Sequence, residues 1–453
     1  MENQPQAFTP KSKSQFSDSI LFKLGLVLIL ILLLLIPSSW IQSIILERSQ
    51  RQDEVVKEIS DKWASEQLLE GPVLILPYKT VIVENDKAGK ITSREVIRNI
   101  YILPDQLNMN ANVAPEILHR GIFDAVVYNT KIKVNGNFSA LEVQKSGIKS
   151  DMILWDKVKL AIGITDLKGL KKNPFVKLET KVYPVEADFS ALALFKNNLV
   201  ILADISKEKR TNLEFSFDLD LSGSNELSFL PLGKTTQVKV NGDWNNPSFT
   251  GRNLPEQREV GEKNFSAAWS IPYFNRPYPQ QWIADNEQLH GKTEAAFGIG
   301  FILPVDQYQK TTRSAKYGIL IILLTFISLF ITEVMTKKKV HILQYILIGA
   351  AMIIYYVLLL SFSEQLGFNL AYLIASAATV LLIGTFIAAL LNQRKPALLF
   401  GAILTVFYGF IFVIIQLQDL ALLIGSIGLF VIVAILMYFS AKIDWSKYNT
   451  PQL

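Results

Sequence analysis

Apolar residues along this chain gather into long uninterrupted runs and do not recur at the spacing of an amphipathic core. The first run covers residues 24–45, and five more crowd the C-terminal third at 317–334, 342–362, 368–391, 397–416 and 420–439. Runs of about 20 apolar residues are long enough to cross a bilayer core of about 30 Å. The pattern therefore predicts a membrane protein with six transmembrane α-helices, one N-terminal and five C-terminal.

The first run could instead be a cleaved signal peptide, because Lys11, Lys13 and Lys23 precede it as basic residues precede such a peptide. However, the run is longer than the usual apolar region of about 7–15 residues, and no small-residue cleavage site follows it. We therefore expect an uncleaved anchor.

The loops between the runs carry an alternating charge pattern. Basic residues follow the second, fourth and sixth runs: Lys337, Lys338, Lys339, Arg394, Lys395, Lys442 and Lys447. Loops 363–367 and 417–419 contain no Lys or Arg. Because basic loops stay in the cytoplasm, the pattern predicts cytoplasmic tails at 1–23 and 440–453 and an outer segment at 46–316.

The outer segment begins and ends with predicted helices. Residues 46–69 have apolar side chains at helical spacing (Val56, Ile59 and Trp63), and Gly71-Pro72 should end this helical stalk. Near the other end, Asp306 can cap a second helical stalk over 306–316 that continues into the span at 317.

Between the stalks, residues 71–304 alternate apolar and polar positions or carry β-branched runs, which predicts a large β-rich domain. Asn135-Gly136 and Asn241-Gly242 are typical of hairpin turns. The surrounding sequences K-V-N-G-N-F and K-V-N-G-D-W resemble each other. Two copies of one β-unit would explain the likeness, and so would repeated use of a common turn.

Composition agrees with a membrane location, since 50% of the residues are hydrophobic, 19% are charged and the mean hydropathy is +0.28. The chain has no Cys, which excludes disulfides and thiolate chemistry, and only three His residues, His119, His290 and His341. Most of the net charge of +5 lies in the tails and loops, because residues 46–316 hold 35 basic and 34 acidic residues and so carry only +1. We therefore expect no nucleic-acid partner.

The middles of the spans contain no ionisable side chain, which disfavours an ion-coupled pump. Glu333, His341 and Glu364 are expected at the interfaces with solvated heads. Ala371, Ala375 and Thr379 recur every four residues, a spacing typical of helix packing. Scattered polar residues could still line a groove: Gln344, Tyr345, Tyr355, Tyr356, Asn369 and Tyr372.

Catalytic motifs give no lead. Residues 232–235 (L-G-K-T) lack the first glycine of a phosphate loop, and neither H-E-x-x-H nor G-x-S-x-G occurs. We therefore expect no enzyme activity, cofactor or metal.

Aromatic residues and prolines are densest over 265–288, where Trp269 and Trp282 precede Asp285 and Glu287. Exposed aromatics beside carboxylates are typical of a sugar-binding cleft or a glycosidase pair. The alternative is an aromatic loop that packs over a β-sheet.

Several motifs resemble the CreD-like family of bacterial inner-membrane proteins, called cell envelope integrity proteins. The likeness lies in G-P-V-L-I-L-P-Y at 71–78, R-G-I-F at 120–123, P-V-D-Q-Y at 304–308, S-F-S-E at 361–364 and G-F-N-L-A-Y at 367–372. The resemblance implies an inner-membrane location, an N-terminal anchor, a periplasmic domain and a C-terminal bundle. It also implies a link to envelope stress and to tolerance of agents such as β-lactams.

We therefore expect a non-enzymatic protein that supports envelope integrity by periplasmic binding or coupling. Its expected partners are membrane lipids and either cell-wall fragments or another envelope protein. A lipid or small-solute transporter and a periplasmic cell-wall enzyme are the alternatives. The candidate functional residues are Trp63, Arg120, Trp269, Trp282, Asp306, Glu364 and Asn369.

Overall fold

The computed structural model describes residues 20–85, 91–139, 147–188, 194–206, 212–283, 294–303, 307–336, 338, 340–417 and 420–442. The chain divides into two compact units. The helical unit comprises Met1–Arg51 and Val305–Leu453, and the β-rich unit comprises Gln52–Pro304. A large β-rich domain therefore lies between the first helix and the later helices, as the hydrophobic pattern predicts.

The helices are α1 (Ile20–Trp63), α2 (Gln307–Lys316), α3 (Gly318–Thr336), α4 (Ile342–Leu366), α5 (Phe368–Leu391), α6 (Arg394–Gln416) and α7 (Ala421–Lys442). Among the described residues, five helical segments are long and apolar enough to cross a membrane: Lys23–Trp63, Gln307–Thr336, Ile342–Leu366, Phe368–Leu391 and Arg394–Gln416. A shorter apolar stretch, Ala421–Ile435, lies in α7. These segments confirm the predicted class of a membrane protein with one early helix and several late ones.

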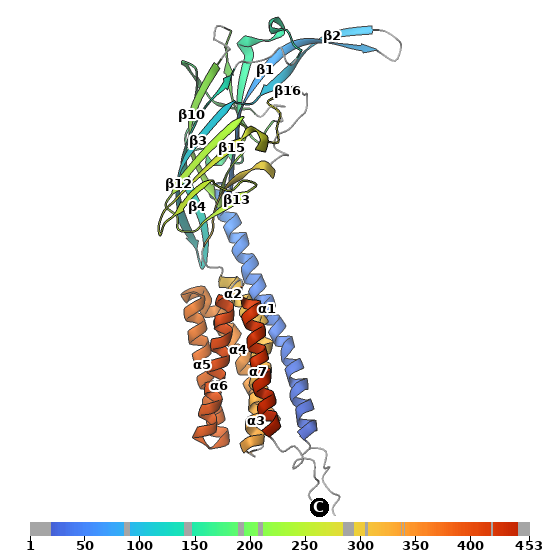
Figure 1. Cartoon of the computed structure of the whole chain (residues 1–453), viewed down its shortest axis with the longest axis vertical. Coiled ribbons are helices and arrows are strands. Elements are labelled where there is room, and N and C mark those ends of the chain that lie inside the picture. The colour runs from blue at the N-terminus through green and yellow to red at the C-terminus, as the bar shows by residue number, and fades with distance from the viewer. Residues whose placement is uncertain are drawn as a thin grey trace, which may run out of the picture. The chain divides into compact units, whose positions relative to one another are not determined.

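Helices α3 to α7 lie alongside one another in the helical unit (Figure 1). α4 contacts α5, α5 contacts α6, and α6 contacts α3 and α7. Ala371, Ala375 and Thr379 are all buried on one face of α5, where their small side chains let neighbouring helices approach closely.

The second helical stalk predicted over 306–316 corresponds to α2, which packs against the bundle. It contacts α4, α5 and α6, and it buries Tyr308, Thr311, Ser314 and Ala315. Residues three or four apart share one face of a helix, so α2 has a face to bury. A turn at Tyr317 separates α2 from α3, and Asp306 lies outside the described residues.

The first stalk, expected over 46–69, is shorter than predicted, because α1 ends at Trp63. Strand β1 (Gln67–Asn85) begins four residues later and passes through Gly71-Pro72 without ending there. Gln67 pairs in parallel with Leu227, and Leu69 pairs with Ile164 on another strand. The local pattern of this segment predicts a helix, but these long-range backbone hydrogen bonds hold it in a strand.

The β-rich unit consists of two sheets (Figure 1). The nine-stranded sheet contains β1, β2 (Ile91–Ile102), β5 (Val158–Ile164), β8 (Glu186–Asp188), β9 (Asn198–Ala203), β11 (Glu226–Phe229), β13 (Pro247–Gly251), β16 (Gln281–Ile283) and β17 (Phe297–Phe301). The eight-stranded sheet has the order β14 (Gln257–Val260), β15 (Phe265–Pro272), β12 (Thr235–Gly242), β3 (Gln106–Arg120), β4 (Phe123–Ser139), β10 (Asn212–Ser224), β6 (Phe175–Leu178) and β7 (Lys181–Pro184).

One apolar core joins the inner faces of the two sheets. Trp269 on β15 lies 5.6 Å from Phe297 on β17, measured between ring centroids, and Phe265 lies 6.3 Å from Phe301. Each of these pairs brings together one ring from each sheet. Buried and exposed positions alternate along β12, as expected for a sheet with one solvated face.

Two pairs predicted to be turns lie in strands instead. Asn135-Gly136 lies inside β4. A Cβ on Gly136 would be only 2.0 Å from the carbonyl oxygen of Gln106 on β3. Glycine therefore allows a close approach of two strands here and not a turn. Asn241-Gly242 forms the end of β12. The proposed duplication of one β-unit stays a prediction.

Candidate functional site

The seven candidate residues are divided between the two units. Glu364 and Asn369 belong to the helical unit. Trp63, Arg120, Trp269 and Trp282 belong to the β-rich unit, and Asp306 lies outside the described residues.

Glu364 is the centre of a polar cluster at the end of α4. The Tyr308 hydroxyl on α2 donates a hydrogen bond to Oε1 of Glu364 over 2.9 Å. Arg48 Nε on α1 lies 3.9 Å from the same oxygen, and the Glu364 side chain is only 15% exposed. One carboxylate therefore binds both α1 and α2 to α4.

Asn369 belongs to the same end of the bundle through a second chain of hydrogen bonds. Lys310 Nζ on α2 donates to Oε1 of Gln416 over 3.1 Å, and Gln416 Nε2 donates to Oδ1 of Asn369 over 2.6 Å. We call Arg48, Tyr308, Lys310, Glu364, Asn369 and Gln416 the Glu364 cluster. It joins α2 to the ends of α4, α5 and α6. The hydrogen bond between Gln416 and Asn369 is neutral and contributes about 0.5–1.5 kcal/mol, whereas the other two each involve a charged group.

A second carboxylate, Glu333, lies near the C-terminal end of α3. It is buried, whereas the sequence predicts a solvated side chain. The Tyr345 hydroxyl donates to its Oε2 over 3.1 Å, and the Val340 amide donates to its Oε1 over 3.1 Å. The Lys23 ammonium on α1 forms an ion pair with Glu333 and donates to the Val340 carbonyl. This Glu333 cluster pins α1 to α3 and α4.

His341 has a structural role beside this cluster. Its Nδ1 accepts a hydrogen bond from the Leu343 amide, and its own amide donates to the Gln344 side chain. The two bonds form a capping box at the start of α4.

Tyrosine rings fill the bundle between the two clusters. The Tyr355 ring lies 4.8 Å from Tyr356, 6.0 Å from Tyr372 and 4.9 Å from Tyr408. All four side chains are buried. Within the described part of the chain, the Tyr356 and Tyr408 hydroxyls have no hydrogen-bond partner, whereas Tyr372 donates to the Tyr408 carbonyl over 2.8 Å.

In the β-rich unit, Arg120 stands at the end of β3, and its Nη1 lies 2.7 Å from Oε2 of Glu58 on α1. Both side chains are almost half exposed. Trp63, the last residue of α1, is half-buried, and its indole nitrogen has no hydrogen-bond partner among the described residues. The structure therefore places both candidates at the end of α1.

The end of α1 is held by a denser set of contacts that the sequence does not reveal. Lys168 Nζ donates to the Asp61 carbonyl over 3.0 Å. A basic group near a helix C-terminus interacts favourably with the helix dipole. Asp166 accepts hydrogen bonds from the amide and the hydroxyl of Ser65. Gln67 is 2% exposed, and its side chain both donates to and accepts from the Asp166 backbone. We call Asp61, Ser65, Gln67, Asp166 and Lys168 the helix joint.

The electrostatics of the helix joint follow from these contacts. Burial works to raise the pKa of Asp166, but the amides of Ser65 and Lys168 outweigh it and hold the pKa below its ordinary value. Asp166 therefore stays ionised at neutral pH and continues to accept their hydrogen bonds.

Glu70 on β1 is a further buried carboxyl that the sequence reasoning missed. It is 2% exposed, and its Oε1 has no hydrogen-bond partner within the described ranges. Burial raises the pKa of Glu70 to about 7. A Cβ on the neighbouring Gly163 would lie 2.9 Å from Glu70 Oε2, so glycine leaves room for the carboxyl.

The two candidate tryptophans do not form one exposed platform. Trp269 is 2% exposed, and its indole donates to the Asn253 carbonyl over 3.0 Å. Its position follows from the alternation of β15, which points every second side chain into the core. Trp282 lies in the other sheet and stacks on Tyr101 at 5.3 Å. The expected carboxylates Asp285 and Glu287 lie outside the described residues.

No group of three or more metal-ligating side chains gathers within the parts of the chain that the structure describes.

Comparisons with known proteins agree with this architecture. A family model described as "Inner membrane protein CreD" matches residues 19–446. The chain is also 28% identical over 423 residues to a protein of Escherichia coli (strain K12) named "Inner membrane protein CreD", and the match covers 93% of each chain.

Proposed function

The chain belongs to the CreD family of inner membrane proteins, and we propose that it supports envelope integrity by coupling its β-rich unit to its helical unit without catalysis. In this proposal the β-rich unit binds an envelope component. The bound state then changes how α1 engages the helices.

The observation that carries the proposal is the continuity of α1. This helix is uninterrupted from Ile20 to Trp63, so its first part belongs to the helical unit and its last twelve residues, from Gln52, to the β-rich unit. Charged contacts hold it at Glu333 and Glu364 in the helical unit and at Arg120 in the β-rich unit. Pro37 lies within the helix, but the stretch from Arg48 to Trp63 contains no Pro or Gly, so it is suited to transmit a displacement between its contacts.

The proposed orientation rests on charge. Basic residues follow the second, fourth and sixth spans, and the loops after the third and fifth spans have none. The positive-inside rule then supports cytoplasmic termini and a periplasmic β-rich unit.

A pair of glycines in α1 tests the coupling. Gln50 and Asp53 are exposed on the helix, and Gly is less favourable than Ala in a helix interior by about 1 kcal/mol per residue. We expect Gln50→Gly with Asp53→Gly to lose complementation under β-lactam stress in a strain that lacks its own copy. The matched control, Gln50→Ala with Asp53→Ala, removes the same side chains and should complement.

Immunoblotting of membranes must show equal abundance of the two variants. Equal complementation by both would overturn the coupling proposal, because helix stiffness would then be irrelevant.

Transport of a lipid or small solute is the second candidate. One observation favours it: the buried hydroxyls of Tyr356 and Tyr408, which have no partner in the described structure, give the bundle a polar interior. A transporter should show net flux of solute or lipid in proteoliposomes, and Tyr356→Phe with Tyr408→Phe should reduce that flux. Lack of flux in the wild-type protein would remove this candidate.

A further inference from the structure

Amide side chains cover the middle of the outer face of the eight-stranded sheet. Register pairs Asn108 on β3 with Asn135 on β4 and with Gln237 on β12. The neighbouring rows add further amides, and seven of them are here called the amide face: Asn108, Asn110, Asn112, Asn135, Asn137, Gln237 and Asn241.

Folding alone does not account for these residues. Asn is depleted from β-strands, yet β3 carries three in alternate positions and β4 also carries three. The intervening residues Leu107, Met109 and Ala111 are buried and supply the packing that holds β3 in the sheet. The amides point the other way, where Thr or Lys would suit a solvated strand better.

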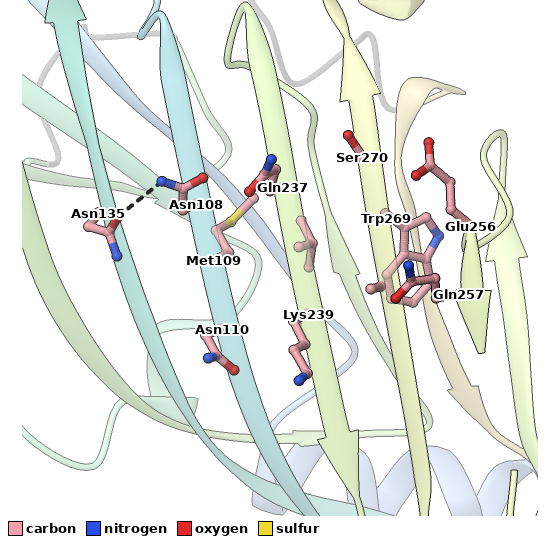
Figure 2. Close-up of a pocket in the computed structure, with 12 residues that line it drawn as sticks. Asn108, Met109, Asn110, Asn135, Gln237, Lys239, Glu256, Gln257, Trp269 and Ser270 are labelled. Carbon is pink, nitrogen blue, oxygen red and sulfur yellow. Dashed lines mark hydrogen bonds between the residues drawn. The ribbon is translucent and has the colours of Figure 1, made fainter. Parts of the chain in front are cut away.

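Hydrogen bonds between strands orient the amides. Asn108 Nδ2 donates to Asn135 Oδ1 over 3.1 Å, and Figure 2 shows this bond beside Gln237 on the next strand. Asn137 Nδ2 donates to Asn212 Oδ1 over 2.6 Å. A primary amide has two donor hydrogens and an acceptor oxygen, so a single bond of this kind leaves capacity for a ligand.

The same face is hollowed in several places. Hollows of about 470 and 440 Å³ both include Asn108 and Asn135 in their walls. A third hollow, of about 510 Å³, is lined by Lys131, Lys133 and Lys177 among other residues. Volumes of this size fall in the range of small-molecule sites.

Lysines flank the amides in the row of Asn110, whereas Glu256 lines one of the hollows and Glu179 and Glu214 line another. Register places Lys239 between Asn110 and Ala268, with no carboxylate directly opposite. Lys133 also pairs with Asn110 and faces Asp218 on its other side. A ligand across the row of Asn110 would therefore meet an amide between two lysine ammonium groups.

We infer that the amide face binds a glycan strand that carries acetamido and carboxylate groups. Sugar hydroxyls and acetamido groups both donate and accept hydrogen bonds, as Asn and Gln side chains do, and the lysines complement carboxylates. An added peptide strand needs a free sheet edge, whereas β3 has a paired strand on each side. This inference deepens the proposed function, because it names the class of ligand that the β-rich unit would bind.

The test uses the full chain in lipid nanodiscs and a soluble tetrasaccharide of alternating N-acetylglucosamine and N-acetylmuramic acid. We expect Asn108→Thr with Asn135→Thr to weaken binding by about tenfold, which corresponds to the loss of one or two hydrogen bonds. Thr favours strands, so the sheet should keep its stability. Asn99→Thr removes an amide from β2 in the other sheet and should bind normally.

A second probe tests the lysines. The N-acetylglucosamine tetramer has the acetamido groups but no carboxylate, so the wild-type chain should bind it more weakly, and Lys239→Gln should abolish the difference. Unchanged tetrasaccharide affinity in the double variant, or no binding by the wild-type chain, would overturn the inference.

The two proposals can fail separately. If the tetrasaccharide does not bind but the glycine pair in α1 still abolishes complementation, coupling stands with a different ligand. If the tetrasaccharide binds but the glycine pair complements, the amide face stands without coupling.

Discussion

Two buried carboxyls, one in each unit, have opposite surroundings. Glu333 in the helical unit accepts hydrogen bonds from Tyr345 and Val340 and pairs with Lys23. Glu70 in the β-rich unit is more deeply buried, and its Oε1 has no partner among the residues described. A buried charge with partners locks helices together, whereas a buried carboxyl without them responds to protons. Each prediction below tests one side of this contrast.

The largest effect is expected at Glu333. Removing one partner of a buried ion pair leaves the other unpaired, so Glu333→Ala should destabilise the protein by about 3–5 kcal/mol. Thermal unfolding of the purified chain in detergent would measure the loss. Lys23→Met together with Glu333→Leu should recover much of it, since no buried charge is left alone. If the double variant is no more stable than Glu333→Ala, the loss of stability does not come from the broken ion pair.

Glu70 should give the next largest effect, and it should depend on pH. Its pKa is about 7 in the folded protein against 4.5 for a solvated carboxyl, a difference worth about 3 kcal/mol. This stability is fully present below pH 4.5 and is lost as pH rises through 7. Glu70→Gln should therefore be more stable than wild type at pH 8 and equally stable at pH 4.

Denaturant unfolding followed by tryptophan fluorescence would give the difference between the two chains at each pH. A constant difference from pH 4 to pH 8 would mean that Glu70 does not titrate in this range.

The Glu364 cluster should affect function more than stability. Glu364→Ala with Asn369→Ala removes hydrogen bonds to Tyr308 and Gln416, which should reduce stability by about 1–2 kcal/mol. We expect loss of complementation under envelope stress at normal membrane abundance. Leu366→Ala, a substitution of an exposed residue between them, serves as the control. Full complementation by the double variant would exclude this cluster from function.

The smallest effect on stability is expected at the Glu58–Arg120 pair, because exposed ion pairs contribute little. Arg120→Ala should leave the unfolding temperature unchanged within error. A large loss would show that Arg120 supports the end of α1 through more than its charge, and Arg120→Lys would then separate charge from shape.

The helical unit was the easier part to predict from sequence. Backbone polar groups in a bilayer must bond within their own helix, so a run of apolar residues is sufficient to indicate a span. Glu364 and Asn369 are candidates from the sequence, and the structure places both in one cluster. The burial of Glu333 does not follow from the sequence, because its partner Lys23 is 310 residues away.

The β-rich unit was predicted as a class but not in its details. The sequence does not predict a strand over 106–120, because Asn108, Asn110 and Asn112 have low β-propensity. Asn135-Gly136 is typical of a turn, whereas in the structure the close approach of Gln106 from a neighbouring strand explains why residue 136 is a glycine. In both places contacts between distant segments outweigh local preference.

The order of residues alone therefore determines which segments cross the membrane and that a β-rich domain separates the first helix from the rest. Both features follow from local hydrophobicity and its period, which need no knowledge of distant partners. Only the tertiary structure decides where α1 ends, which carboxyls are buried, and which strands bring seven amides onto one face. Each of these depends on strand register and on contacts between residues far apart in the chain, and no local pattern encodes them.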